Sequence, residues 1–330
     1  MSLRQALAGS ISGTAPAFFA DLWLRAAKDL QRTGCGWRRA PKQLLGYVLG
    51  VNAPQTKSER FLALHDADRP LLLPNPWDAG SAKLLASLGF DALATTSGGF
   101  AATLGRLDGS VTRDEALAHA AVIVAATDLP VSADLENGFA DEPNDVADTV
   151  ALAIGAGLAG CSVEDFTRQA DAPIYDMGHA VARVAAAAEV AHAGSSQFVL
   201  TARAENHLHG RQDLNDTITR LQAYQEAGAD VLYAPGLTRL DDVRALVEAV
   251  DRPVNVLALP GSPPVSELAA VGVRRISVGG AFAYAALGAV VEAARELREE
   301  GTYEFWSAAL TGVGAAHAAF PEASSPDVAP

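Results

Sequence analysis

The chain of 330 residues is short of cysteine, of long apolar runs and of positive charge, and each shortage excludes a class of protein. Its two cysteines, Cys35 and Cys161, cannot build a disulfide scaffold or a four-thiolate zinc site, and they suit a reducing compartment such as the cytoplasm. No run of about 18 uncharged apolar residues occurs, which excludes a membrane span on length. A P-loop, a dinucleotide fingerprint and a Ser/His/Asp arrangement are also missing.

The deficit of positive charge is uneven along the chain. With 25 basic and 39 acidic residues the net charge is −14, which argues against nucleic acid or an anionic membrane as a partner and favours a small ligand. Residues 1–57 nevertheless carry eight basic and two acidic side chains. We therefore predict a basic, loosely ordered extension over 1–57, a folded region with extra C-terminal helices over 58–312, and a flexible tail over 313–330.

What the sequence has in plenty is apolar residues, 49% in all, arranged as alternating strand and helix patterns from Phe61 onward. The strands are spaced by roughly 29 residues, which suits a strand followed by one crossover helix. The pattern predicts an α/β fold, a parallel (β/α)8 TIM barrel. The expected strands begin near Leu71, Asp91, Val131, Gly160, Phe198, Val231, Val254 and Arg275.

Acidic residues follow two neighbouring strands at the end where such barrels place their reactive groups. Asp134 and Glu136 follow the third strand, and Glu164 ends the fourth. If the three carboxylates converge on one point, a cation must offset their repulsion, and oxygen ligands favour Mg²⁺ or Mn²⁺ over zinc. The alternative is a solvated rim whose carboxylates cap the next helices, and the residues alone favour neither interpretation.

Two further features lie at the same end of the predicted barrel. Ser97, Gly98 and Gly99 offer consecutive backbone amides that could hold a carboxylate or an oxyanion, although a glycine pair in a tight turn is the simpler explanation. Arg203 ends an apolar strand and needs an anion, which could be a ligand or Glu205. In the following loop, His207 and His209 could act near neutral pH or bind anions, although a lone histidine in a loop is usually solvated.

These motifs, taken in order, resemble the isocitrate lyase and phosphoenolpyruvate mutase superfamily. The resemblance covers roughly residues 61–294. It implies a barrel that binds Mg²⁺ and a 2-oxo acid or its enolate, and that breaks or forms a C–C or P–C bond beside that enolate. The segments that carry it are 75–82 (NPWDAGSA), 96–99 (TSGG), 104–109 (LGRLDG), 133–138 (ADLENG), 163–165 (VED), 202–205 (ARAE), 254–258 (VNVLA) and 276–279 (ISVG).

The resemblance also implies roles for individual residues. Asp134 would lie nearest the metal, with Glu136 and Glu164 reaching it through water, and Glu136 departs from the aspartate usual at its position. Asp108 and Arg203 would be catalytic, Asp108 beside the reacting bond and Arg203 on the anionic group. The residues expected to bind substrate are Trp77, Asp78, Ser97, Gly98, Gly99, Arg203, Glu205 and Asn255.

The loop after the fourth strand departs from the lyases of this superfamily. They carry a Lys-Lys-Cys-Gly-His motif whose cysteine acts as the acid, whereas this chain has Met177-Gly178-His179 and no preceding lysines. Cys161 cannot substitute, because it lies inside a strand. We therefore expect a Mg²⁺-dependent lyase that cleaves or decarboxylates a small, oxaloacetate-like 2-oxo acid through a metal-stabilised enolate.

Two other functions stay open at this point. One is P–C chemistry on phosphonopyruvate, by mutase or hydrolase action. The other is a 2-oxo-acid binding protein with little turnover. The apolar segment from Tyr303 to Leu310, together with a region that commonly packs across subunits in the superfamily, predicts a homodimer or homotetramer.

Overall fold

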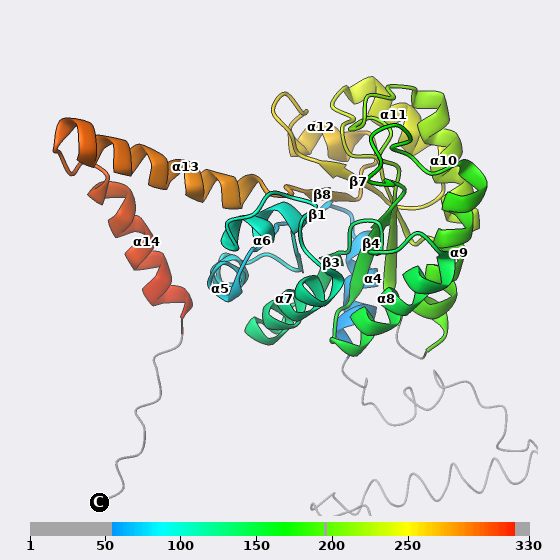
Figure 1. Cartoon of the computed structure of the whole chain (residues 1–330), viewed down its shortest axis with the longest axis horizontal. Helices are drawn as coiled ribbons and strands as arrows, with labels where there is room; N and C mark the ends of the chain where they lie inside the picture. The colour runs from blue at the N-terminus through cyan, green and yellow to red at the C-terminus, as the bar shows by residue number, and fades with distance from the viewer. Residues whose placement is uncertain (1–54, 195–196, 321–330) are drawn as a thin grey trace, which may run out of the picture. The chain divides into compact units, whose positions relative to one another are not determined.

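The structure, a computed structural model, describes residues 55–194 and 197–320. Within these ranges eight parallel strands form a nearly closed barrel (Figure 1), which confirms the predicted (β/α)8 fold. Hydrogen-bonded neighbours follow the order β1-β8-β7-β6-β5-β4-β3-β2. The strands are β1 (Leu71–Leu73), β2 (Leu93–Ala94), β3 (Val131–Asp134), β4 (Gly160–Glu164), β5 (Val199–Arg203), β6 (Val231–Tyr233), β7 (Val254–Leu257) and β8 (Arg275–Ser277).

The helices surround this barrel, and two of them, α4 before β1 and α6 before α7, are additional to the one crossover helix predicted after each strand. The Thr112–Glu115 capping box is present at the start of α7, where each side chain accepts a hydrogen bond from the other's backbone amide. The helices of the barrel are α4 (Lys57–Ala63), η2 (Leu64–Asp66), α5 (Ala79–Ser87), α6 (Ser97–Thr103), α7 (Arg113–Ala126), α8 (Pro143–Gly155), α9 (Met177–His192), α10 (Leu214–Glu226), α11 (Leu240–Ala249) and α12 (Val265–Ala270).

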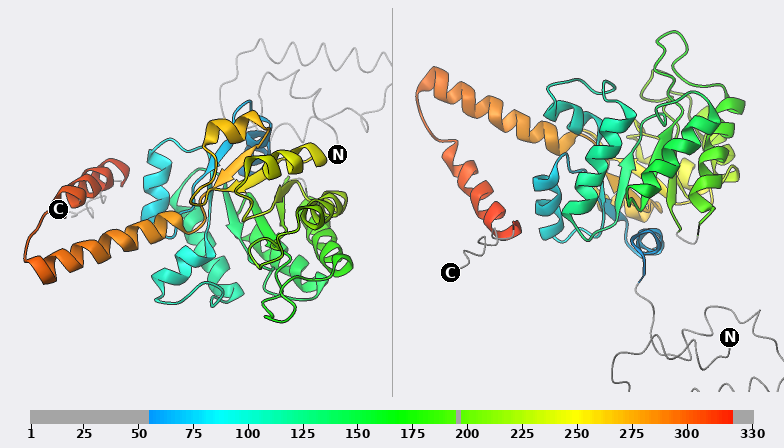
Figure 2. Two further views of the ribbon diagram at one scale, coloured as in Figure 1. Left: turned by 90° about the horizontal axis from the view of Figure 1, so that it is seen from above. Right: turned by 60° about the horizontal axis from the view of Figure 1, so that its bottom comes forward.

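Helix α4 packs against the end of the barrel where the strands begin (Figure 2). Its Phe61 is fully buried in a cluster with Leu71, Val199 and Val231, the first residues of β1, β5 and β6. The helix begins at Lys57 and is capped by Thr56. The last three residues of the predicted extension over 1–57 thus belong to the described chain and lead into α4. Residues 1–54 lie outside the described residues.

The two outer strands of the order, β1 and β2, meet at a seam. The Ala94 amide donates to the Pro74 carbonyl across it at 3.0 Å. Asn75 adds three side-chain bonds, donating to the Thr95 carbonyl at 3.0 Å and accepting from the amides of Val278 at 3.0 Å and Gly279 at 2.9 Å. A single asparagine thereby ties the ends of β1, β2 and β8 together.

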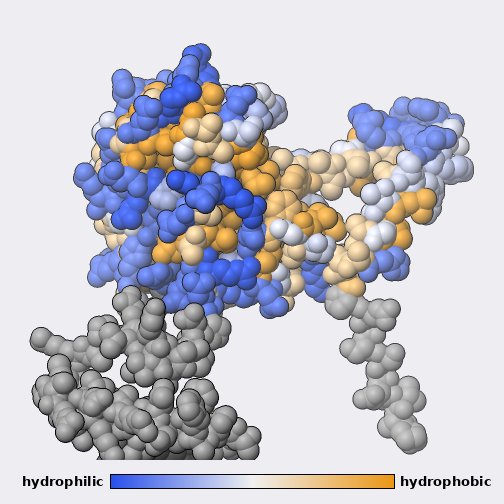
Figure 3. All heavy atoms as spheres, turned by 180° about the vertical axis from the view of Figure 1, so that it is seen from behind, coloured by the Kyte–Doolittle hydropathy of each residue, from blue (hydrophilic) through white to orange (hydrophobic). Residues whose placement is uncertain are grey.

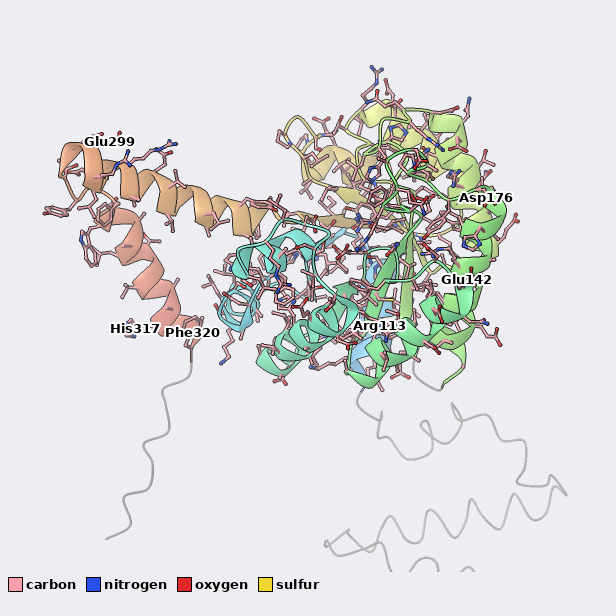
Figure 4. The ribbon with its side chains drawn as sticks, in the orientation of Figure 1. Arg113, Glu142, Asp176, Glu299, His317 and Phe320 are labelled. Carbon is pink, nitrogen blue, oxygen red and sulfur yellow. The ribbon has the colours of Figure 1, made fainter. Side chains whose placement is uncertain are left out.

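After β8 the chain forms an arm of helices α13 (Ala281–Arg295), η3 (Glu296–Glu300) and α14 (Trp306–Ala319). Glu299 lies at the far turn of this arm, and α14 returns so that Phe320 lies near α5 (Figure 4). The predicted boundary at residue 312 is wrong, because it falls inside α14. Among the described residues, no helix combines the length and apolarity needed to cross a membrane.

The arm exposes much apolar surface, which continues onto the neighbouring barrel in Figure 3. Only Ala283 is buried in α13, and no residue is buried in α14. The exposed apolar side chains include Tyr284, Val290, Trp306 and Leu310. A surface of this kind is unusual on a soluble monomer, and it is the region for which we predict contact with a second copy.

Candidate active site at the carboxyl ends of the strands

Two adjoining cavities open where the strands end, and they share Ser97, Asp108, Arg203 and Leu208. The outer cavity, of about 380 Å³, lies among the loops that follow the strands. The inner cavity, of about 210 Å³, extends into the barrel between side chains of the strands themselves. Most of the predicted site residues line one cavity or both: Ser97, Gly98, Asp108, Asp134, Glu136, Glu164, Arg203, Glu205 and Asn255.

Arg203 stands at the centre of the site and contacts three carboxylates. Its guanidinium lies 3.0 Å from Asp134 Oδ1, 3.2 Å from Glu164 Oε2 and 2.8 Å from Glu205 Oε1. Burial alone would lower the pKa of Arg203, but Glu205, Glu164 and Asp134 raise it well above its usual range. The positive charge of Arg203 is therefore already neutralised by carboxylates of the protein, and Glu205 is one of them.

Asp134 is held from both sides at the end of β3. Its Oδ2 accepts from the Ser97 amide at 3.3 Å and from the Ser97 hydroxyl at 3.0 Å, while its Oδ1 faces Arg203. The backbone amide of Asp134 donates to Thr95 Oγ1 at 2.9 Å. These contacts fix the orientation of the carboxylate, because each of its oxygens has a donor from a different strand end.

Glu136 reaches the site from an uncommon backbone conformation. Its φ of 48° lies in the left-handed region, as do those of Phe139 (55°) and Arg168 (64°) around the same mouth. Burial raises the pKa of Glu136 to about 7, and the neighbouring Asp134 adds to the rise. The side chain pairs with Arg168, which comes from the loop after β4 and was not predicted as a site residue.

The loop that carries Glu136 is held from behind by Arg183 of α9. This arginine is 1% exposed and donates to the backbone carbonyls of Asn137, Ala140 and Asp141, the last at 2.7 Å. The ring of Tyr175 lies 4.2 Å from the guanidinium carbon. Arg183 thus satisfies carbonyl groups that the irregular loop could not pair by itself.

The Ser97–Gly99 segment forms the first turn of α6, and its amides are only partly free. The Ser97 amide is bound by Asp134 and the Gly99 amide by Thr96 Oγ1, which leaves Gly98 to face the inner cavity. A side chain at Gly99 would place its Cβ 2.5 Å from Thr96 Cγ2, so close packing requires glycine there. The tight-turn explanation therefore accounts for Gly99 but not for Gly98.

Trp77 and Asp78 lie beside the site, and neither lines the two cavities. The Asp78 carboxylate accepts from the Ser81 amide at 2.6 Å and caps α5. The Trp77 carbonyl is bound by His119 Nε2 at 2.9 Å. In this structure both residues support the turn after β1, because their polar groups are used in holding it.

The remaining candidates divide between the site and its surroundings. His209 lines the outer cavity and stacks on Phe166 with ring centroids 3.8 Å apart, and burial lowers its pKa. His179 lies at the start of α9, where its ring contacts the Asp141 carbonyl at 2.9 Å. Cys161 is fully buried in β4, and burial raises the pKa of its thiol. The prediction that it is a buried small side chain is confirmed.

The predicted metal ligands lie around guanidinium groups rather than around one point. Across the described part of the chain, no three or more His, Cys, Asp or Glu side chains are placed to hold an ion together. The charge of the site nevertheless suits a cation, because five carboxylates line the two cavities against three arginines, Arg168, Arg203 and Arg275. Mg²⁺ takes one or two carboxylates and keeps its waters, so this oxygen-only donor set fits it. The acidic side chains are Asp108, Asp134, Glu136, Glu164 and Glu205.

The chain is similar to proteins from several bacteria over most of its length. A solved structure from Burkholderia cenocepacia J2315, provisionally assigned as a lyase/mutase, is 54% identical and superposes with a TM-score of 0.77, covering 79% of this chain and 94% of that one. An uncharacterized protein of Mycobacterium tuberculosis strain H37Rv is 33% identical over 241 residues, which are 72% of this chain and 89% of that protein.

Relatives with named activities are more distant. The oxaloacetate decarboxylase of Chromohalobacter salexigens is 28% identical over 72% of this chain and 84% of its own length. The structure of a phosphonopyruvate hydrolase in complex with oxalate and Mg²⁺ is 25% identical, with a TM-score of 0.69 over 77% of this chain and 91% of that one. The family model for phosphoenolpyruvate phosphomutase matches residues 61–298. The chain belongs to this family, within the superfamily of isocitrate lyases and phosphoenolpyruvate mutases, as its motifs predicted.

Proposed function

We propose that the protein is a Mg²⁺-dependent lyase that decarboxylates or cleaves a small, oxaloacetate-like 2-oxo acid. The observation that carries the proposal is the arrangement of Asp134, whose two oxygens are fixed by Ser97 and Arg203 within a site that has more carboxylates than cations. The named decarboxylase among the relatives and the Mg²⁺ in the hydrolase structure support it.

Asp134 would hold the cation, with Glu136 and Glu164 facing it through water. A bound Mg²⁺ supplies positive charge that stabilises the enolate left when the bond beside the oxo group breaks. The Gly98 amide would hold the oxo-acid end, while the Ser97 hydroxyl orients Asp134. Arg203 acts here by positioning Asp134 and Glu164, because its own charge is met by the protein.

Decarboxylation is the reaction that best suits the missing acid. Retro-aldol cleavage requires a proton donor at the departing carbanion, and Cys161 is buried inside β4. Loss of CO2 requires no donor at the bond that breaks, since the electron pair remains on the enolate, which then takes up a proton to give the oxo-acid product. Asp108 lines both cavities and is our candidate for a residue beside that bond.

The test is turnover of oxaloacetate, phosphonopyruvate and 2-methylisocitrate with Mg²⁺ and with a chelator. We expect pyruvate and CO2 from oxaloacetate, and a loss of rate when the metal is removed. Oxalate and acetate as products would instead indicate hydrolysis of the C–C bond. Phosphate release from phosphonopyruvate at a higher rate would favour P–C chemistry, and binding without any product would favour a binding protein.

A matched pair of variants locates the metal. Asp134→Ala should lower metal-dependent turnover by at least about 100-fold, because it removes the carboxylate that holds the cation, while the barrel stays folded. Asp114→Ala changes an aspartate whose side chain is 88% exposed and should leave turnover unchanged. Unchanged metal dependence in Asp134→Ala would show that the cation lies elsewhere.

A further inference from the structure

Arg275 of β8 is a buried cation inside the barrel, and it is 3% exposed. Its Nε donates to Asn255 Oδ1 at 2.9 Å, and its Nη2 donates to Thr201 Oγ1 at 3.0 Å. The third nitrogen, Nη1, lies 3.4 Å from His65 Nε2. All three partners are uncharged side chains, so the guanidinium has hydrogen bonds but no counter-ion among them.

His65 cannot become that counter-ion or share the charge. Its Nδ1 lies 2.9 Å from the Phe61 carbonyl, which fixes the proton on Nδ1 and leaves Nε2 as an acceptor toward Arg275. Burial, with Arg203 adding to it, lowers the pKa of Arg275 to about 10, so the group is still charged at neutral pH. No carboxylate of the described residues contributes to that pKa.

A buried charge without a partner of opposite sign is costly, so its retention requires an explanation. The two arginines that line the inner cavity differ sharply in this respect. Arg203 contacts three carboxylates, whereas Arg275 contacts none within the ranges that the structure describes. Of the two guanidinium groups that line the inner cavity, Arg203 is therefore neutralised by carboxylates and Arg275 has no counter-ion among the described residues.

The inner cavity connects Arg275 to the candidate active site. Its lining runs from Ser97, Gly98 and Asp134 at the strand ends to Tyr233, Asn255 and Arg275 inside the barrel. Barrels of this class usually fill that space with branched apolar side chains. Its volume of about 210 Å³ equals roughly seven water molecules, so a ligand here must be small.

We propose that Arg275, with Asn255 beside it, binds a carboxylate of the substrate at the floor of the inner cavity. The substrate would then be a short dicarboxylate, with one end at Asp134 and the other at Arg275. This inference rests on the proposed function for the identity of the ligand, and it assigns the remote carboxylate to Arg275 in place of Arg203. The two N–H groups of a guanidinium fork match the two oxygens of a carboxylate.

The test measures binding rather than turnover, so that it stands if the proposed reaction is wrong. Calorimetric titrations with succinate, acetate and sulfate in Mg²⁺ buffer compare wild type with Arg275→Met. Arg274→Met is the matched control, because Arg274 is the neighbouring residue, is exposed, and has a side chain that donates to the Ala67 carbonyl on the surface. We expect Arg275→Met to weaken succinate binding by about 10- to 100-fold and Arg274→Met to have no effect.

A second variant covers the case in which Arg275→Met fails to fold. Asn255→Asp is isosteric and supplies an internal carboxylate at the existing 2.9 Å contact with Arg275. It should fold at least as stably as wild type and bind succinate at least 10-fold more weakly, because the guanidinium is then neutralised. Wild-type succinate affinity in either folded variant would overturn the proposal.

The three probes distinguish a site for a dicarboxylate substrate from a general anion site. Succinate binding that is much tighter than binding of acetate or sulfate supports a site for a dicarboxylate substrate. Sulfate binding as tight as succinate binding would mean a general anion site and would overturn the assignment to the substrate. Turnover that fails while Arg275-dependent succinate binding persists would count against the proposed reaction but not against this site.

Discussion

Lowering the pH from 7.5 to 5.0 should destabilise the barrel through His65, which lies between Phe61 and Arg275. Burial and the charge of Arg275 lower the pKa of His65 from 6.5 to about 3. As the pH falls below about 6.5, the unfolded chain takes up a proton on this ring, whereas the ring in the folded chain stays neutral. The free energy of unfolding is therefore at its full value above pH 6.5 and decreases as the pH falls toward 3.

The size of this effect follows from the shift. Each pKa unit corresponds to about 1.4 kcal/mol, and pH 5.0 lies about 1.5 units below the ordinary value of 6.5, so His65 should account for about 2 kcal/mol of lost unfolding free energy. Urea unfolding of wild type and His65→Gln at both pH values measures it. Glutamine can donate to the Phe61 carbonyl and accept from Arg275, but it cannot be protonated in this range.

The expected result is that His65→Gln loses about 2 kcal/mol less than wild type between the two pH values. His317→Gln is the control, because it removes a ring that is exposed on α14. If His65→Gln and wild type lose the same free energy, the folded chain protonates His65 as readily as the unfolded chain does, and the reasoning is refuted.

Three other predictions concern the ends of the chain and the substrate. A chain that begins at Gln55 should fold and bind ligand, and one that begins at Ser58 should be about 1 kcal/mol less stable in urea, because it lacks the Thr56 cap of α4; failure of both to fold would show that residues 1–54 are needed. Light scattering at micromolar concentration should return a dimer or tetramer mass, since α13 and α14 expose apolar side chains, and a monomer mass would contradict this. Isocitrate and 2-methylisocitrate should not be cleaved at an enzyme-like rate, because no acid replaces the superfamily cysteine; efficient cleavage would mean that another group, such as His179 or Asp171, donates the proton.

The strands were predictable because parallel strands that are buried on both faces leave short apolar runs. Seven predicted starts fall within one residue of those observed, and β2 begins at Leu93 rather than near Asp91. Helix α6 was missed because its sequence, SGGFAAT, is only seven residues long and begins with a serine and a glycine pair. Helix α4 was missed because a change in net charge was taken as the boundary, although Phe61 already belongs to the core.

The positions of site residues were predictable where an acidic residue directly ends an apolar strand, as at Asp134 and Glu164. They were not predictable where the contact depends on register or loop path. Arg274 and Arg275 are adjacent, and a shift of one residue decides which of them faces the barrel interior. The contact between Arg168 and Glu136 depends on two left-handed backbone positions that no local preference favours.

The left-handed positions at Glu136, Phe139 and Arg168 have a consequence for how the mouth of the barrel can evolve. Each such residue costs of order 1–3 kcal/mol relative to a relaxed backbone, and glycine would relieve that strain. Glycine at 136 or 168 would, however, delete the carboxylate or the guanidinium that the strained backbone presents. Phe139 is not free of this limit either, because its ring packs against the hydrophobic core and lies 5.7 Å from the guanidinium carbon of Arg168. Substitutions that relax the backbone at the mouth of the barrel would therefore remove a contact of the site at each of the three positions.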